Sequence, residues 1–108
     1  MQHETTLEKT TLATIAEAIQ LKRVIMVTYN GERLQLNPHQ LFARHHSVYL
    51  RAFNPAKSLR HDEDPTLGNF NIAGMSDIDV TTDAFEPLAS FDAEVVKAGD
   101  NALVSVDD

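Results

Sequence analysis

The sequence predicts a mostly β domain with one N-terminal α-helix, closed into a small β-barrel. Three observations lead to this prediction. One apolar stripe with helical spacing lies near the N-terminus, five or six short β-type segments follow it, and tight turns separate those segments. Short strands joined by tight turns favour a closed sheet, because closure hides the strand edges that an open meander exposes.

An amphipathic helix is predicted over about residues 7–21. Its first turn contains Glu8, and Thr5 or Thr6 is a suitable N-terminal cap. Its apolar residues recur at i, i+3, i+4 and i+7, and they are Leu12, Ile15, Ala16 and Ile19. This face is expected to pack on the sheet.

A β-hairpin is predicted next. Residues 24–29 are β-branched and aromatic, which is typical of a strand. Asn30-Gly31 follows, and both residue types tolerate the positive φ that a type I′ turn requires. Residues 32–36 return as the second strand, and Pro38 is expected to end that strand or to place it at an edge.

A second hairpin is predicted to join residues 41–43 to residues 47–53, with Arg44, His45 and His46 at the bend. Side chains alternate between the two faces of a strand, so residues 48, 50 and 52 share one face and residues 49, 51 and 53 share the other. Both faces carry large side chains, which predicts a central strand.

The second half of the chain is predicted to add shorter strands. Residues 54–67 form a long polar loop, residues 68–72 and 78–81 form strands, and Phe85 closes the core. Residues 1–88 are therefore interpreted as the domain. Residues 89–108 are interpreted as an acidic C-terminal extension, in which residues 94–96 and 102–106 form a hairpin added to the sheet or part of a tail.

Composition limits the possible functions. The chain has 108 residues, enough for one domain, and no cysteine, which excludes disulfides and thiolate metal sites. No apolar run approaches the about 20 residues that a membrane span needs. The polar N-terminus lacks the apolar segment of a signal peptide. A cytoplasmic location without membrane association is expected.

Charge is divided unevenly along the chain. Residues 1–60 hold eight Lys or Arg and four Asp or Glu, whereas residues 61–108 hold one and twelve, so that +4 and −11 sum to the net charge of −7. One face can therefore be basic although the whole chain is acidic. The other interpretation is a solubilising acidic tail.

The order of these segments resembles the WYL domain of bacterial regulators. The resemblance is carried by Ala18-Ile19 at the helix end, the strand ending Val27-Thr28-Tyr29, Pro38 and Leu41, Val48-Tyr49-Leu50, Phe70-Asn71-Ile72, Ile78 and Phe85. Val48 takes the place of the signature Trp. The resemblance implies an SH3-like or Sm-like barrel that senses a ligand, often nucleic acid or a nucleotide. It also implies a regulatory role, here as a stand-alone domain without the usual helix-turn-helix.

The sequence departs from this family around the closing strand. The family tends to carry arginines around the Phe of this strand and shortly after it. Here Asn69 and Asn71 flank Phe70, and Gly74 stands where the later arginine is expected. Those arginines would be natural phosphate contacts, so the resemblance is stronger for the fold than for the binding site.

A ligand-binding site is predicted from the cations of the first half. The candidate residues combine positive charge for phosphate with an aromatic ring for stacking, and they are Arg44, His46, Tyr49, Arg51 and Arg60. The expected ligand is single-stranded nucleic acid or a nucleotide. The alternative function is an acidic protein-interaction module that acts on a basic or nucleic-acid-binding partner.

No catalytic, metal or cofactor site is predicted. His45-His46 and the acidic run at residues 61–64 lack metal-ligand spacing, and four glycines form no phosphate-binding loop. Asp77 and Asp79 lie on one face of a predicted strand, but solvated carboxylates are far commoner than acid–base pairs. The chain is therefore expected not to be an enzyme. Exposed strand edges, including residues 102–106, predict a homodimer or pairing within the chain.

Overall fold

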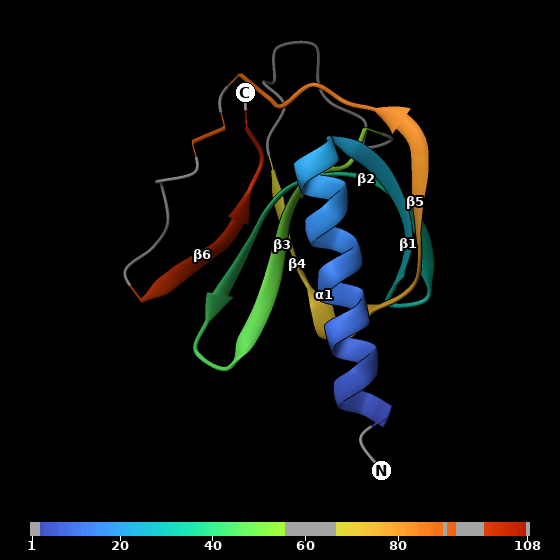
Figure 1. Ribbon diagram of the computed structural model, residues 1–108, viewed down its shortest axis with the longest axis vertical. Helices are drawn as coiled ribbons and strands as arrows, with labels where there is room; N and C mark the ends of the chain where they lie inside the picture. Colours follow the sequence, from blue (N-terminus) through green and yellow to red (C-terminus); the bar gives the residue numbers. More distant parts are fainter. Residues whose placement is uncertain (1–2, 56–66, 90, 93–98, 108) are drawn as a thin grey trace.

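The computed structural model describes residues 3–55, 67–89, 91–92 and 99–107, with side chains from residue 10 onward. Figure 1 shows a single sheet with one long helix beside it. The elements in chain order are α1 (His3–Leu21), β1 (Arg23–Tyr29), β2 (Glu32–Arg44), β3 (Ser47–Phe53), β4 (Gly68–Asn71), the 3-10 helix η1 (Ile72–Gly74), β5 (Met75–Ala84) and β6 (Asp100–Ser105). The prediction of a mostly β chain with one N-terminal α-helix is confirmed.

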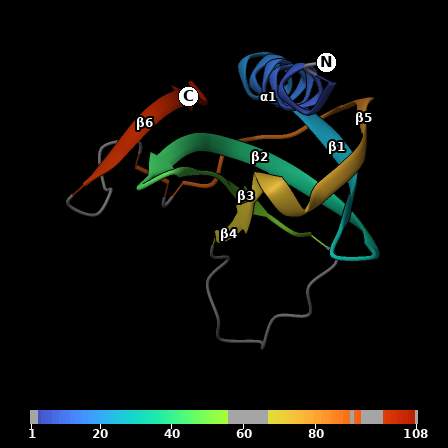
Figure 2. The same cartoon turned by 90° about the horizontal axis from the view of Figure 1, so that it is seen from below.

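All six strands belong to one antiparallel sheet. The strand order is β4-β3-β2-β1-β5, and β6 pairs with β2 outside this path. Figure 2 shows α1 lying against one side of the curved sheet. Strands β4 and β5 end the path, and no ladder joins them among the described residues, so the predicted closed barrel is not confirmed. In the same part of the chain, no helix combines the length and the apolar character that a membrane crossing requires.

Strand β2 is longer than predicted. The two predicted strands on either side of Pro38 are one strand, so the prediction that Pro38 ends a strand is wrong. The strand pairs with β1 as far as Leu36 and with β3 from Asn37 onward. Its register with β3 shifts between Pro38 and Gln40, which marks a β-bulge. A bulge tolerates the missing N–H of proline, and the strand therefore continues through it.

The hydrophobic core lies between α1 and one face of the sheet. Ile15, Ala18 and Ile19 of the helix are fully buried, which confirms the predicted apolar stripe and adds Ala18 to it. Leu50 and Ala52 of β3 are also fully buried in this cluster. Strand β3 lies between β2 and β4, so the prediction of a central strand is confirmed as well.

Both tight turns depend on positive φ angles. Asn30 and Gly31 have φ of 49° and 87°, and the flanking residues Tyr29 and Glu32 pair, as expected for the predicted type I′ hairpin. The turn between β2 and β3 consists of residues 45 and 46 alone, with φ of 55° at His45. Arg44 is therefore a strand residue and not part of the bend.

The C-terminal residues extend the same sheet. Strand β6 lies against the second half of β2, beyond the part that pairs with β1. The Val106 N–H then donates to the His39 carbonyl at 2.8 Å. Pairing within the chain, one of the two alternatives for residues 102–106, is what the structure shows, but the partner is β2. Residues 94–96, the predicted hairpin partner, lie outside the described residues.

His39 joins the bulge of β2 to the segment that follows β5. Its ring is fully buried, with Nδ1 2.8 Å from the Asn37 carbonyl and Nε2 3.0 Å from the Leu88 N–H. The rings of Phe85 and Phe91 lie 5.2 and 5.3 Å away. A carbonyl only accepts and an N–H only donates, so the ring is neutral with its proton on Nδ1. Burial lowers the pKa of His39 below its ordinary value.

This environment predicts a stability that depends on pH. The unfolded chain binds the His39 proton more tightly than the folded chain, because the folded pKa is lowered. The contribution of neutral His39 is fully present above about pH 6.5 and is lost as the pH falls toward the folded pKa. We expect the urea concentration at the unfolding midpoint of the wild type to decrease when the pH is lowered from about 7 to about 5. His39→Leu should be less stable at neutral pH but less sensitive to acid.

All the other histidines are present in both proteins, so the comparison isolates the contribution of His39. Parallel loss of stability by the two proteins over this pH range would contradict the assignment to His39.

Candidate ligand-binding face

The candidate site lies on the side of β2 and β3 that faces away from α1. Leu41 and Leu50 point into the helix-covered core, and their sequence neighbours therefore point to the opposite face. We call this surface the arginine–aromatic face, and it is formed by Phe42, Arg44, Tyr49 and Arg51. Phe42 and Tyr49 are directly opposed in the β2–β3 register, which places the two rings side by side.

The four side chains pack as one unit. The rings of Phe42 and Tyr49 are stacked, with centroids 5.5 Å apart and an interplanar angle of 17°. The Arg44 guanidinium lies over both rings, 5.2 Å from the centroid of Phe42 and 5.6 Å from that of Tyr49. Arg51 lies over Phe42 at 5.4 Å. These cation–π contacts orient both guanidinium groups on the surface of the ring pair.

Phe42 is fully buried although it lies outside the core cluster under α1. The sheet therefore has a second, small packed layer on its outer face, and the two arginines form part of it. Tyr49 and Arg51 are half-buried, so this layer remains open to solvent beside them.

Arg44 is held by an acidic residue from β6. Its Nε donates to Asp100 Oδ1 at 2.8 Å and its Nη2 donates to Asp100 Oδ2 at 2.9 Å. The two residues are also opposed in the β2–β6 register. The Asp100 side chain is 1% exposed and that of Arg44 is 26% exposed. The hydrogen bonds to Asp100 raise the pKa of Arg44, and the pair carries no net charge.

The structure brings together three of the five predicted site residues. Arg44, Tyr49 and Arg51 lie on one face, but Arg44 is already paired with a carboxylate. His46 is exposed in the β2–β3 turn and lines a separate hollow, and Arg60 lies outside the described residues.

The sequence did not lead us to predict Phe42, which belongs to the face, or Asp100, which holds Arg44 from β6. Alternation within the predicted strand at residues 41–43 contained the signal for Phe42, because that residue points away from Leu41. No local pattern contained a signal for Asp100, which is 56 residues from Arg44.

Asparagines flank the face on its β4 side. Asn69 is opposed to Arg51 and Asn71 is opposed to Tyr49 in the β3–β4 register. The Asn71 side chain accepts from the Ala73 N–H at 2.9 Å and so caps η1. Asn69 is exposed. Amides therefore stand where the family resemblance led us to expect arginines.

Packing explains the glycine at position 74. A Cβ atom on Gly74 would lie 2.8 Å from Asn30 Oδ1 and 3.1 Å from Tyr29 Cε1. Tyr29 cannot easily move, because its hydroxyl accepts from the Asn71 N–H at 3.2 Å and its ring meets the Phe70 ring edge-on at 5.3 Å. A side chain at position 74, including that of arginine, would therefore require the Asn30 side chain to turn away and the Tyr29 ring to shift.

We therefore expect Gly74→Arg to destabilise the fold by about 1–3 kcal/mol, the usual cost of overpacking. Ala73→Arg is the matched control, because Ala73 is exposed in the same turn and should change the free energy of unfolding by less than about 0.5 kcal/mol. Urea unfolding of both variants measures the difference. Equal effects would show that no close contact restricts position 74.

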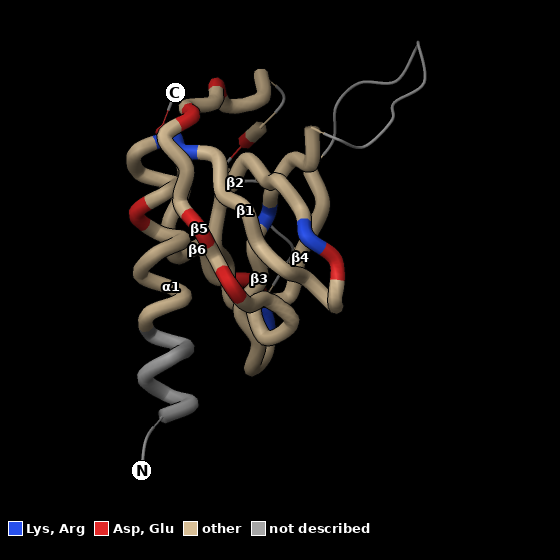
Figure 3. The backbone as a smooth tube through the Cα atoms, turned by 90° about the vertical axis from the view of Figure 1, so that its right-hand side faces the viewer, with Lys and Arg blue, Asp and Glu red and all other residues tan. Residues whose placement is uncertain are grey.

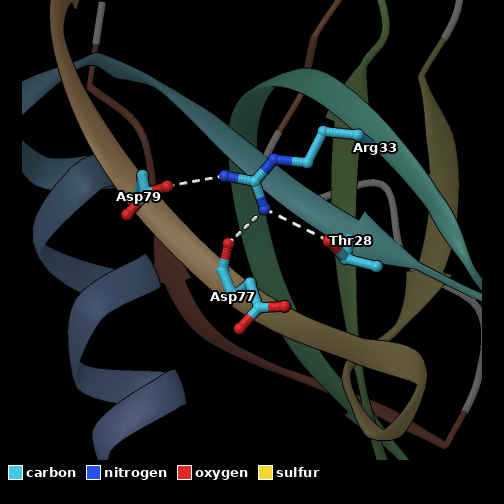
Figure 4. Close-up of polar contacts among 4 residues, drawn as sticks. All are labelled: Thr28, Arg33, Asp77 and Asp79. Atoms are coloured by element: carbon cyan, nitrogen blue, oxygen red, sulfur yellow. Dashed lines mark hydrogen bonds and ion pairs between the residues drawn. The ribbon is translucent and has the colours of Figure 1, made fainter.

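A second arginine–aspartate pair lies at the other end of β2 (Figure 4). Arg33 Nη2 contacts Asp79 Oδ2 of β5 at 2.6 Å, and Nη1 donates to Thr28 Oγ1 at 3.2 Å and to the Asp77 carbonyl. Asp77 has a φ of 50° at a register shift between β1 and β5. The prediction that Asp77 and Asp79 share a face assumed regular alternation, which this irregularity interrupts. The carboxylate of Asp79 is paired with Arg33.

A hollow of about 140 Å³ lies between α1 and the end of β3, away from the arginine–aromatic face. It is lined by Leu12, His46, Ser47, Val48, Asn71, Ile72 and Ala73. Val48, which takes the place of the signature Trp, lies on its wall. No three His, Asp or Glu side chains in the described ranges are grouped so that they could hold a metal ion.

Comparison with known proteins supports the fold. The solved structure of proteasome accessory factor B/C (PafBC) of Arthrobacter aurescens is similar, with a TM-score of 0.64 and 22% identity over 77% of this chain and 13% of that chain. This chain thus corresponds to a small part of that protein's length. No curated protein sequence matches it. The family model of the WYL domain matches residues 10–80, from α1 into β5. The match covers more than half of the sequence, and the chain therefore belongs to the WYL domain family.

Proposed function

We propose that this WYL domain is a regulatory binding module, not an enzyme, and that its arginine–aromatic face takes a nucleotide-type ligand. The observation that carries this proposal is the stacked pair of Phe42 and Tyr49, with one guanidinium from β2 and one from β3 over it. A base and a phosphate together need an aromatic surface and a nearby cation, and both are present in one packed unit.

The exposure and the neighbours of Tyr49 and Asn69 suggest how each would contact a base. Tyr49 is half-buried and stacks on Phe42 on one side, so a base would stack on what remains exposed of its ring. Base–aromatic stacking contributes about 1–3 kcal/mol per base. Asn69 presents an exposed amide opposite Arg51, and an amide can bind the edge of a base.

We assign the phosphate contact to Arg51. It lies next to Tyr49 on the same face, separated by one residue on β3, and its guanidinium is oriented by the Phe42 ring. Arg44 contributes no net charge in this state, because it is paired with the buried Asp100. The face therefore suits a ligand that presents one phosphate rather than a long row of phosphates.

This assignment predicts a shallow salt dependence. With one phosphate contact, the logarithm of the affinity for a single-stranded oligonucleotide of about ten thymidines should fall against the logarithm of salt with a slope near about −0.7. Arg51→Ala should weaken binding about tenfold and make the slope nearly flat. Fluorescence anisotropy at several salt concentrations measures both quantities.

Arg33→Ala is the control, because it removes the same charge at the other end of β2 and should leave the affinity nearly unchanged. Competition by thymidine monophosphate would identify a free nucleotide as a sufficient ligand, whereas its failure to compete would identify the nucleic acid strand. The proposal is wrong if the wild type binds neither probe at low salt.

One observation favours a second candidate function, an acidic interaction module. Strand β5 ends the strand order, and Figure 3 shows acidic residues along it. Asp77, Asp79 and Asp83 are exposed there. Like charges on an edge strand discourage pairing with another acidic strand but attract a basic surface.

This candidate predicts that the wild type binds a lysine-rich peptide at low salt. Replacing Asp77 and Asp83 with Asn should weaken that binding several-fold, and Arg51→Ala should leave it unchanged, because Arg51 lies on β3. Isothermal titration of the peptide measures both effects. Unchanged affinity in the Asp77 and Asp83 double variant would exclude β5 as the interaction surface.

A further inference from the structure

We propose that strand β6 regulates the arginine–aromatic face by holding Arg44 with Asp100, so that a ligand with several phosphates must compete with Asp100 for this guanidinium. The inference rests on the proposed function for the location of the ligand. It goes beyond that function in two ways. The carboxylate of Asp100 competes with the ligand for Arg44, and the release of β6 is coupled to binding.

The geometry of the pair is that of anion recognition. Arg44 donates from Nε and Nη2 to the two oxygens of Asp100, at 2.8 and 2.9 Å. Arginine binds phosphate with the same two-pronged arrangement of parallel hydrogen bonds. The same guanidinium lies over the rings of Phe42 and Tyr49. Asp100 therefore occupies the anion position beside the ring on which a base would stack.

The rings also orient Arg44 independently of Asp100. The guanidinium carbon lies 5.2 and 5.6 Å from the two ring centroids, so the side chain has contacts on the face that do not involve β6. If Asp100 leaves, these contacts still hold the guanidinium near the ligand, and this guanidinium becomes available to phosphate.

Strand β6 is suited to being released. It lies outside residues 10–80, which the family model matches. The middle of the strand buries little, since Asn101 and Ala102 are exposed and Leu103 is 51% exposed. The second half of the strand is held firmly: Val104 packs against the core, Gln40 Nε2 donates to Ser105 Oγ at 3.0 Å, and the buried Val106 donates its N–H to the His39 carbonyl. The first end is held by its backbone pairing with β2 and by Asp100 on Arg44. Loss of the Asp100 anchor would free the first end of the strand.

The consequence is a distinction between ligands. A mononucleotide uses Arg51 and leaves β6 in place. A single strand with several phosphates also binds the wild type mainly through Arg51, and only a minor bound state, in which Asp100 is displaced, adds a second contact at Arg44. Binding of the strand and release of β6 are then coupled, and each must favour the other by the same free energy.

Asp100→Asn tests this competition. The substitution keeps the shape of the side chain but removes its charge, so oligonucleotide affinity should rise about tenfold, the effect of one charge-assisted hydrogen bond. The salt slope should steepen by about 0.7, which corresponds to one additional phosphate contact. Combining Asp100→Asn with Arg44→Ala should abolish the gain. Affinity for thymidine monophosphate should change little.

Asp79→Asn is the matched control. It also removes one negative charge and one arginine–aspartate pair, but at Arg33, and the Asp79 side chain is 74% exposed. Its oligonucleotide affinity should stay within about twofold of the wild type, because surface pairs contribute little. Equal gains from both variants would mean that net charge alone controls binding and would overturn the inference.

Hydrogen exchange on the wild type provides a second measurement that needs no substitution. Saturating oligonucleotide should accelerate exchange at the amides of residues 101–103, at the first end of β6, and saturating thymidine monophosphate should not. Unchanged or slower exchange with the oligonucleotide would overturn the release of β6.

The results separate this inference from the proposed function. Wild-type binding that depends on Arg51 but is unaffected by Asp100→Asn would overturn only the competition. Oligonucleotide binding that appears only in Asp100→Asn, while the wild type binds thymidine monophosphate, would support it. Absence of binding by the wild type and by every variant at low salt would overturn both.

Discussion

Strand β2 pairs with β1 along its first half and with β3 and β6 along its second half. It can do so because the chain continues through the bulge at Pro38, where a missing N–H is tolerated. His39 at the same bulge is buried and joined to Leu88 and Val106. One bent strand thus positions the first hairpin, the signature strand and the C-terminal strand, and a break at the bulge would separate the two halves of the sheet.

The same strand gives the molecule two different faces. Leu41 and Leu50 pack under α1 in the core, whereas Phe42 and Tyr49 form a smaller layer on the outside with Arg44 and Arg51 over it. Aromatic rings tolerate guanidinium groups on their surface because of cation–π attraction, so cations can pack there without an apolar cover. The layer that packs on this side of the sheet is therefore also the part that we propose as the ligand-binding surface, and Asp100 connects it to β6.

Local patterns predicted much of this architecture. The spacing of Ile15 and Ile19 predicted the buried side of α1, Asn30-Gly31 predicted the hairpin turn, and alternation along β3 predicted which side chains share a face. These features depend on residues within a few positions of one another, which is the range over which backbone geometry repeats. Alternation also placed Tyr49 and Arg51 together, so part of the candidate site could be predicted in the same way.

The sequence by itself thus determined the helix, the turns, the faces of the strands and membership of the WYL domain family. Tertiary structure alone decided that β2 continues through Pro38, that a side chain at position 74 would crowd Asn30 and Tyr29, and that Asp100 holds Arg44. Each of these depends on the approach of segments that are distant in the chain. The register between β2 and β6 places Arg44 opposite the buried Asp100. These two strands are distant in the chain, so a local pattern of residues cannot predict their register.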